Sequence, residues 1–183
     1  MRGIARIALL AAVGAVSVGV LAVTAEEAAK PQYIGSAACG TCHKSAKSGE
    51  QLGKWQASRH ALAFATLGTP EAAAVAKKAG VAGSPQEAAE CLSCHVTAYG
   101  VDAALIATPR AGKKGFEAAD GVQCEACHGA GSEYKSRKVM KDHEAAVAAG
   151  MIVPDEALCV TCHNAKSPTY KAFNYAEMLA KIA

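Results

Sequence analysis

The stretch Gly121 to Tyr134, GVQCEACHGAGSEY, contains the pattern Cys-x-x-Cys-His at residues 124–128. The same pattern occurs at residues 39–43, 91–95 and 159–163, so there are four copies. Together the copies use every cysteine of the chain: Cys39, Cys42, Cys91, Cys94, Cys124, Cys127, Cys159 and Cys162. The pattern is typical of c-type heme attachment, in which two thiols bind the heme and the adjacent histidine binds its iron. The sequence therefore predicts four heme c groups with four proximal iron ligands: His43, His95, His128 and His163.

Two other uses of paired cysteines have to be weighed against heme attachment. An even number of cysteines in an exported chain commonly forms disulfides, and Cys-x-x-Cys pairs can bind zinc. Neither use explains why each of the four pairs is followed at once by a histidine. The repeated histidine therefore favours heme.

The first 25 residues are predicted to be a secretory signal peptide. Arg2 and Arg6 precede an apolar run over residues 7–23, and small residues follow before Glu26. The apolar run is slightly shorter than the roughly 20 residues that span a membrane, and an uncleaved anchor, with membrane contact through the N-terminus, is the alternative. We expect residues 26–183 to form one tetraheme domain, either in the periplasm or otherwise exported, or anchored to the membrane and facing the periplasm.

Charge gives little support for a nucleic-acid partner. Removal of residues 1–25 leaves 17 Lys and Arg residues against 16 Asp and Glu residues, a net charge of +1. The heme propionates add further negative charge, so the loaded protein is expected to be mildly acidic. A redox protein that docks through complementary charges fits this balance better than a nucleic acid does.

The fold is predicted to be mainly α-helical, with short helices, long loops that wrap the hemes, and little or no β-structure. The chain has only three Phe and one Trp, so we expect the hemes to supply much of the core. Apolar spacing and capping signals predict helices over residues 50–67, 70–80, 85–95, 117–128, 134–149, from 156 into the fourth motif, and from 174 to the end. Residues 97–115 are expected to be irregular.

Two histidines lie outside the motifs and are candidate sixth ligands of heme iron. These are His60, in the first predicted helix, and His143, in the fifth. His60 follows His43 by 17 residues, about 25 Å of helix, and His143 follows His128 by 15 residues, so each is expected to serve a heme other than the one before it. Methionines such as Met140, Met151 and Met178 are alternative ligands, although helical methionines more commonly serve in packing.

Five stretches beyond the bare motifs resemble the cytochrome c-554 family of tetraheme cytochromes, whose type member accepts electrons from hydroxylamine oxidoreductase. They are Tyr33 to Ser36 with the first motif, Trp55 to Ala61 (WQASRHA), the second motif, Gly121 to Gly129 (GVQCEACHG), and Phe173 to Met178 (FNYAEM). These stretches follow one another over nearly the whole of residues 26–183.

The resemblance implies a set of iron ligands for the four hemes. It pairs His60 with His128 and His143 with His43, and it leaves the face opposite His95 open. In the family the fourth heme has a histidine just beyond the last helix, but this sequence stops at Ala183. The ligand opposite His163 is thus expected to be absent, Met178, or a group from another chain.

Electron transfer is the function that these observations favour. Four hemes on so short a chain must lie close together, and no arrangement of acids and bases beside them indicates an enzyme. We therefore expect an electron carrier between a donor and an acceptor redox protein. The alternatives are a reductase of nitric oxide or nitrite at a five-coordinate heme, and a self-associating subunit of a heme wire or membrane-bound redox complex.

Overall fold

The computed structural model describes residues 30–182, and the predicted signal peptide lies outside them. The described residues form ten α-helices, none longer than nine residues. The α-helices are α1 Ser36–Gly40, α2 Gln51–Gln56, α3 Ala63–Thr66, α4 Pro70–Lys78, α5 Ala89–His95, α6 Cys124–His128, α7 Arg137–Met140, α8 His143–Ala148, α9 Glu156–Cys159 and α10 Tyr175–Leu179. Three 3-10 helices lie between them: η1 Ala46–Ser48, η2 Ala103–Leu105 and η3 Ala118–Asp120. The only β-type pairing in this part of the chain is an isolated bridge between Tyr33 and Ile106, so the predicted mainly α fold is confirmed.

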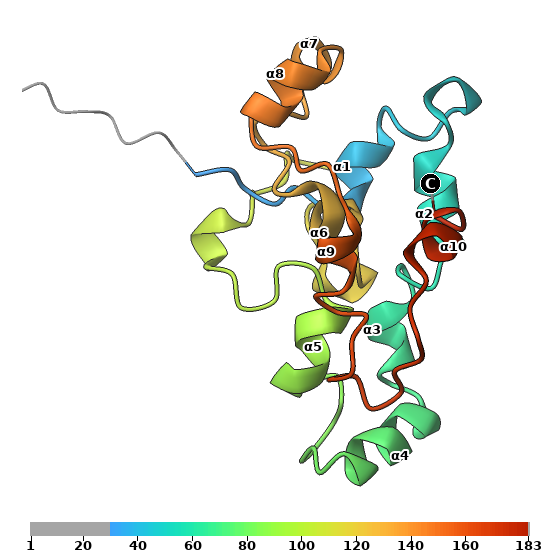
Figure 1. Cartoon of the computed structure of the whole chain (residues 1–183). Coiled ribbons are helices and arrows are strands. Elements are labelled where there is room, and N and C mark those ends of the chain that lie inside the picture. The colour runs from blue at the N-terminus through green and yellow to red at the C-terminus, as the bar shows by residue number, and fades with distance from the viewer. Residues whose placement is uncertain (1–29, 183) are drawn as a thin grey trace, which may run out of the picture.

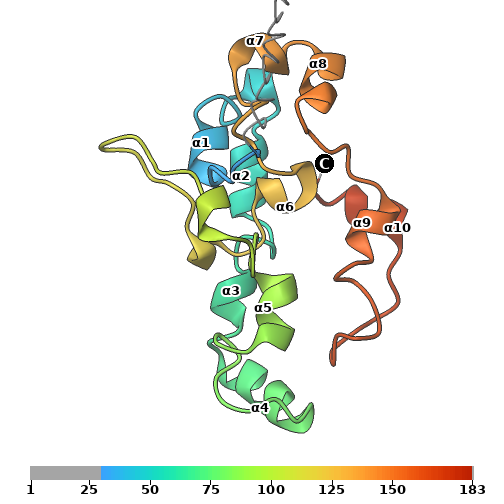
Figure 2. The same ribbon diagram turned by 90° about the vertical axis from the view of Figure 1, so that its left-hand side faces the viewer.

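The helices are arranged along an elongated molecule in an order that differs from their order in the sequence. Figures 1 and 2 show α7 and α8 at one end, α1 and α6 next to them, then α3 and α5, and α4 at the other end. The segment with α9 and α10 runs along one side of this column. Helix α1 packs against both α2 and α6, and α3 packs against α5 and η3. The helices of the first and third motifs are therefore neighbours, although 85 residues separate Cys39 from Cys124.

Several helix starts lie where the sequence predicts them. Thr69 accepts a hydrogen bond from the amide of Ala72 and begins α4, with Pro70 in the first turn. Asp155 caps α9 in the same way through the amide of Leu158. Asn174 caps α10 through the amide of Glu177. Each cap satisfies an amide that has no partner within its helix.

The prediction of one helix over residues 50–67 is wrong, because this segment forms two helices with a turn between them. Helix α2 ends at Gln56, α3 begins at Ala63, and His60 lies in the turn. The carbonyl of His60 accepts a hydrogen bond from the amide of Val122, at 3.0 Å. This long-range bond keeps the turn against the third motif and competes with helical pairing.

Three other predicted helices are also shorter than expected. Residues 134–149 divide into α7 and α8, because Asp142 caps the second helix through the amide of Ala145. Residues 117–128 divide into η3 and α6 at Gly121. Helix α5 begins only at Ala89, because the residues before it form a turn in which the amide of Glu87 bonds the carbonyl of Ser84.

The protein side chains alone make a small core. The buried apolar residues of the described chain are Ile34, Leu67, Ala76, Ala88, Tyr134 and Ala146, and three of these six are alanines. Such a set buries little apolar area compared with a domain of this length. In residues 30–182, no helix has the length and apolar character needed to cross a membrane.

Candidate functional site

Two motif histidines are oriented by backbone carbonyls. The Nδ1 atom of His95 lies 2.8 Å from the carbonyl oxygen of Ala63. The Nδ1 atom of His128 lies 3.1 Å from the carbonyl oxygen of Ile152. A carbonyl can only accept, so Nδ1 must carry the proton in both rings, and Nε2 is left with the lone pair that binds a metal. Both histidines therefore fit the role of iron ligand.

His60 lies beside the histidine of the fourth motif. The ring centres of His60 and His163 are 6.0 Å apart, with an angle of 64° between the rings. Two imidazoles that bind one metal from opposite sides, at about 2 Å each, have ring centres about 6 Å apart. Burial lowers the pKa of His60, and the neighbouring His163 lowers it further, so the neutral form that binds metals is favoured.

This arrangement differs from the ligand pairs that the family resemblance implied. The resemblance placed His60 opposite His128 and gave His163 no histidine partner within the chain. In the structure His60 is the neighbour of His163, and Phe173 stacks on the His163 ring at 4.8 Å between centres. The sulfur of Met178, the alternative ligand from this chain, lies 3.7 Å from the ammonium of Lys181.

The other two histidines are not brought together by any described contact. His143 is the first residue of α8 and is exposed. His43 lies in the turn after α1 and is half-buried. Within residues 30–182, neither ring makes a hydrogen bond or a ring contact, and the pairing of His43 with His143 remains a prediction.

Six cysteines from the four motifs interact in pairs that join different motifs. All eight cysteines of the chain are free thiols. The neighbouring thiol of Cys124, and then burial, raise the pKa of Cys39. The same interaction lowers the pKa of Cys124, against the opposing effect of burial. Burial and then the neighbouring thiol of Cys94 raise the pKa of Cys162 to about 11.

A third pair links these two pairs. Burial raises the pKa of Cys127, and the nearby Cys159 raises it further. Cysteines therefore lie near one another between the first and third motifs, the third and fourth, and the fourth and second. The pairs link all four motifs in this order, which differs from their order in the sequence.

The turn before the third motif positions the loop that contains His60. The indole Nε1 of Trp55 donates to the carbonyl of Val122 at 2.7 Å, and the amide of Val122 donates to the carbonyl of His60 at 3.0 Å. Gly121 has φ +72°, and a Cβ atom there would lie 2.7 Å from the His60 carbonyl oxygen. Only glycine allows this close approach. The two sequence stretches WQASRHA and GVQCEACHG therefore form one structural unit.

Two polar side chains of the third motif region are buried. Gln123 accepts a hydrogen bond from the amide of Ser36 at 2.9 Å and donates one to the carbonyl of Glu117 at 2.8 Å. Glu125, only 2 % exposed, lies between the two cysteines of the motif. Sequence reasoning missed both residues. An acid between the cysteines, found only in the third motif, is the signal that points to Glu125.

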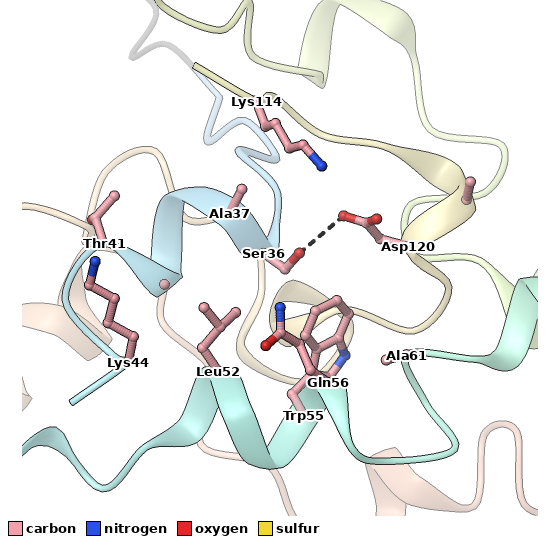
Figure 3. A pocket seen from close by; sticks show the side chains of 12 residues that line it. Ser36, Ala37, Thr41, Lys44, Leu52, Trp55, Gln56, Ala61, Lys114 and Asp120 are labelled. Carbon is pink, nitrogen blue, oxygen red and sulfur yellow. Dashed lines mark hydrogen bonds between the residues drawn. The ribbon is translucent and has the colours of Figure 1, made fainter. Parts of the chain in front are cut away.

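A cavity of about 500 Å³ lies between α1 and α2, and Figure 3 shows Lys114 and Asp120 at its edge. Its α1 side is formed by Ser36, Ala37 and Gly40. Cys39 points elsewhere, because its thiol contacts Cys124 and the carbonyl of Gly35. The cavity is therefore on another face of α1 from Cys39.

Comparison with known proteins gives one match. A family model described as cytochrome c554 and c-prime matches residues 38–129, which is half of the chain. The match includes the first three motifs, His60 and the Gly121 turn, and the fourth motif lies beyond it. Neither the curated proteins nor the solved structures contain a match.

Proposed function

The chain belongs to the cytochrome c554 and c-prime family, and from this premise we propose that it is a periplasmic carrier that transfers electrons through four covalently bound heme c groups. Membership of the family assigns covalently bound heme and a role in heme-based electron transfer. The number of hemes, the periplasmic location and the absence of catalysis are the parts that we propose. When bound, the hemes supply one-electron oxidation and reduction at iron.

The observation on which this proposal rests is the nearness of six thiols that come from all four motifs. The interactions between Cys39 and Cys124, Cys127 and Cys159, and Cys94 and Cys162 link the four motifs into one row. An electron carrier needs its redox centres close together, whereas hemes that each catalysed a separate reaction would not need to be close. The row predicts that electrons pass in the order first, third, fourth and second motif, or the reverse.

The protein's own residues attach, orient and separate these centres. The cysteines fix each heme to a short helix or turn, and the carbonyls of Ala63 and Ile152 orient His95 and His128. His60 and His163 supply two imidazoles at a spacing that fits one iron. The partners of the carrier are a donor and an acceptor redox protein. The predicted signal peptide agrees with export, because heme is attached to thiols outside the cytoplasm.

Stoichiometric redox titration tests the proposal. The purified, oxidised protein is expected to take up four electrons per chain and to release all four on reoxidation, with heme retained on the chain after denaturation. The matched control is the double variant Cys91→Ala/Cys94→Ala, which should take up three electrons. Uptake of fewer than four electrons by the unaltered protein, or heme lost on denaturation, would contradict the proposal.

A further inference from the structure

Glu125 is a buried carboxylate whose partners are all backbone amides. Its Oε1 accepts from Ile34 N at 2.9 Å and from Gly131 N at 2.7 Å. Its Oε2 accepts from Gly35 N at 2.7 Å and from Ile34 N at 3.0 Å. The bonds connect the third motif with the segment that enters the first motif and with the chain that follows the third.

No cation neutralises this carboxylate among the described residues. The one ion pair in residues 30–182 joins Lys181 and Glu177 at the C-terminal end. Amide dipoles stabilise an anion without removing its charge, and the field of that charge is strong where water is excluded. A negative charge is thus held between Cys124 and Cys127, next to Cys39.

We propose that Glu125 is a positioning residue and a fixed anion, which fastens the first motif to the third and lowers the reduction potentials of the hemes at these two motifs. The sign follows from charge. Ferric heme has one positive charge more than ferrous heme, so a nearby anion stabilises the oxidised state. The inference rests on the proposed function, because it requires hemes at both motifs.

The neighbouring groups respond to this charge in the expected direction. The pKa of Tyr134 is raised first by burial and then by anionic neighbours that include Glu125. The carboxylate also adds to the rise in the pKa of Cys39, after the hydrogen bond with Cys124 and burial. A field that disfavours negative charge at these positions favours positive charge at an iron held beside them. The corresponding positions in the other motifs, Gly40, Leu92 and Val160, have no charge.

The consequence is a difference in potential between the two halves of the row. The second and fourth motifs lack a buried acid between their cysteines. Electrons entering the partly reduced protein are then expected to rest on the hemes of these two motifs. The first and third motifs form the part of the row that is oxidised more easily.

Spectroelectrochemical titration of Glu125→Gln tests this inference. The amide keeps the size of the side chain and removes its charge, and two of the four midpoint potentials are expected to rise while the other two stay unchanged. The melting temperature should also fall, because the amide nitrogen of Gln faces a backbone N–H that it cannot bond. Gln123→Ala is the matched control: it breaks a buried link between the same two segments and should lower the melting temperature without changing the potentials.

Glu125→Asp separates the charge from the contacts. This variant keeps the anion but retracts it by one methylene, so it should melt earlier with all four potentials unchanged, and it can overturn the inference even if Glu125→Gln does not accumulate. Unchanged potentials in Glu125→Gln, or an upward shift in Glu125→Asp, would overturn the inference. In either case an uptake of four electrons would leave the proposed function standing, whereas an uptake below four would contradict the proposed function itself.

Discussion

At the scale of single residues, the position of a histidine in space decides which iron it can bind. His60 and His163 are far apart in the sequence, yet their rings are 6.0 Å apart, and Phe173 stacks on the second ring. The stacking fixes the orientation of His163 at a small cost in side-chain entropy. The histidine of the fourth motif thereby has another histidine beside it, a nearness that spacing along the sequence did not reveal.

His60→Ala is expected to convert one heme from low-spin to high-spin iron, because the imidazole opposite His163 is removed. Electron paramagnetic resonance of the oxidised protein measures the change, and the exposed neighbour Arg59 provides the control variant Arg59→Ala. Phe173→Ala should perturb the same low-spin signal, since it frees the His163 ring. An intact low-spin signal in His60→Ala would refute the assignment of this ligand, and an effect of Phe173→Ala on a different heme would refute its pairing with His163.

At the scale of elements, the helix over residues 50–67 is interrupted by contacts with a segment distant in the sequence. The amide of Val122 donates a hydrogen bond to the carbonyl of His60, and the carbonyl of Val122 accepts one from the indole of Trp55. Gly121 has no side chain and lets the two backbones approach each other. These contacts place His60 in a turn where its ring can reach the fourth motif. The Gly121 turn therefore positions the loop of His60, the ligand that we propose for the fourth heme.

Gly121→Ala is expected to destabilise the protein by roughly 2 to 3 kcal/mol, because its backbone conformation is available almost only to glycine. The new Cβ would also lie 2.7 Å from the His60 carbonyl, so some of the low-spin signal from the fourth heme should be lost. Thermal unfolding and paramagnetic resonance measure the two effects. Gly100→Ala, with φ +75° in open space, should cost stability alone. Equal spectra for the two variants would contradict the role of the turn.

The start of each capped helix could be predicted from sequence, whereas the end often could not. Thr69, Asp155 and Asn174 each accept a hydrogen bond from the amide three residues ahead, and such local chemistry is visible in the sequence. The interruption at His60 depends on the long-range hydrogen bond from Val122. The division of residues 134–149 depends on Asp142, which caps a new helix inside an otherwise helical pattern. Helical spacing continues through both places, so it predicted helices that were too long.

At the scale of the whole molecule, the protein side chains alone make a small core, and we propose that four hemes supply much of the rest. The buried apolar side chains of the described chain are few and half of them are alanines, while six thiols from the four motifs lie near one another. The sequence predicts four attachment points, because each motif is local, and this number stays a prediction. It could not predict their spatial order, because that order depends on α1 packing against α6 and on the return of the fourth motif to the second and third.

Iron positions in crystals of the heme-loaded protein, located by anomalous diffraction at the iron absorption edge, test the account most directly. The account predicts four iron sites per chain in one row, with the first motif next to the third, the third next to the fourth, and the fourth next to the second. His60 and His163 should flank the fourth iron. Fewer than four sites, or a row that follows the order of the motifs in the sequence, would contradict it.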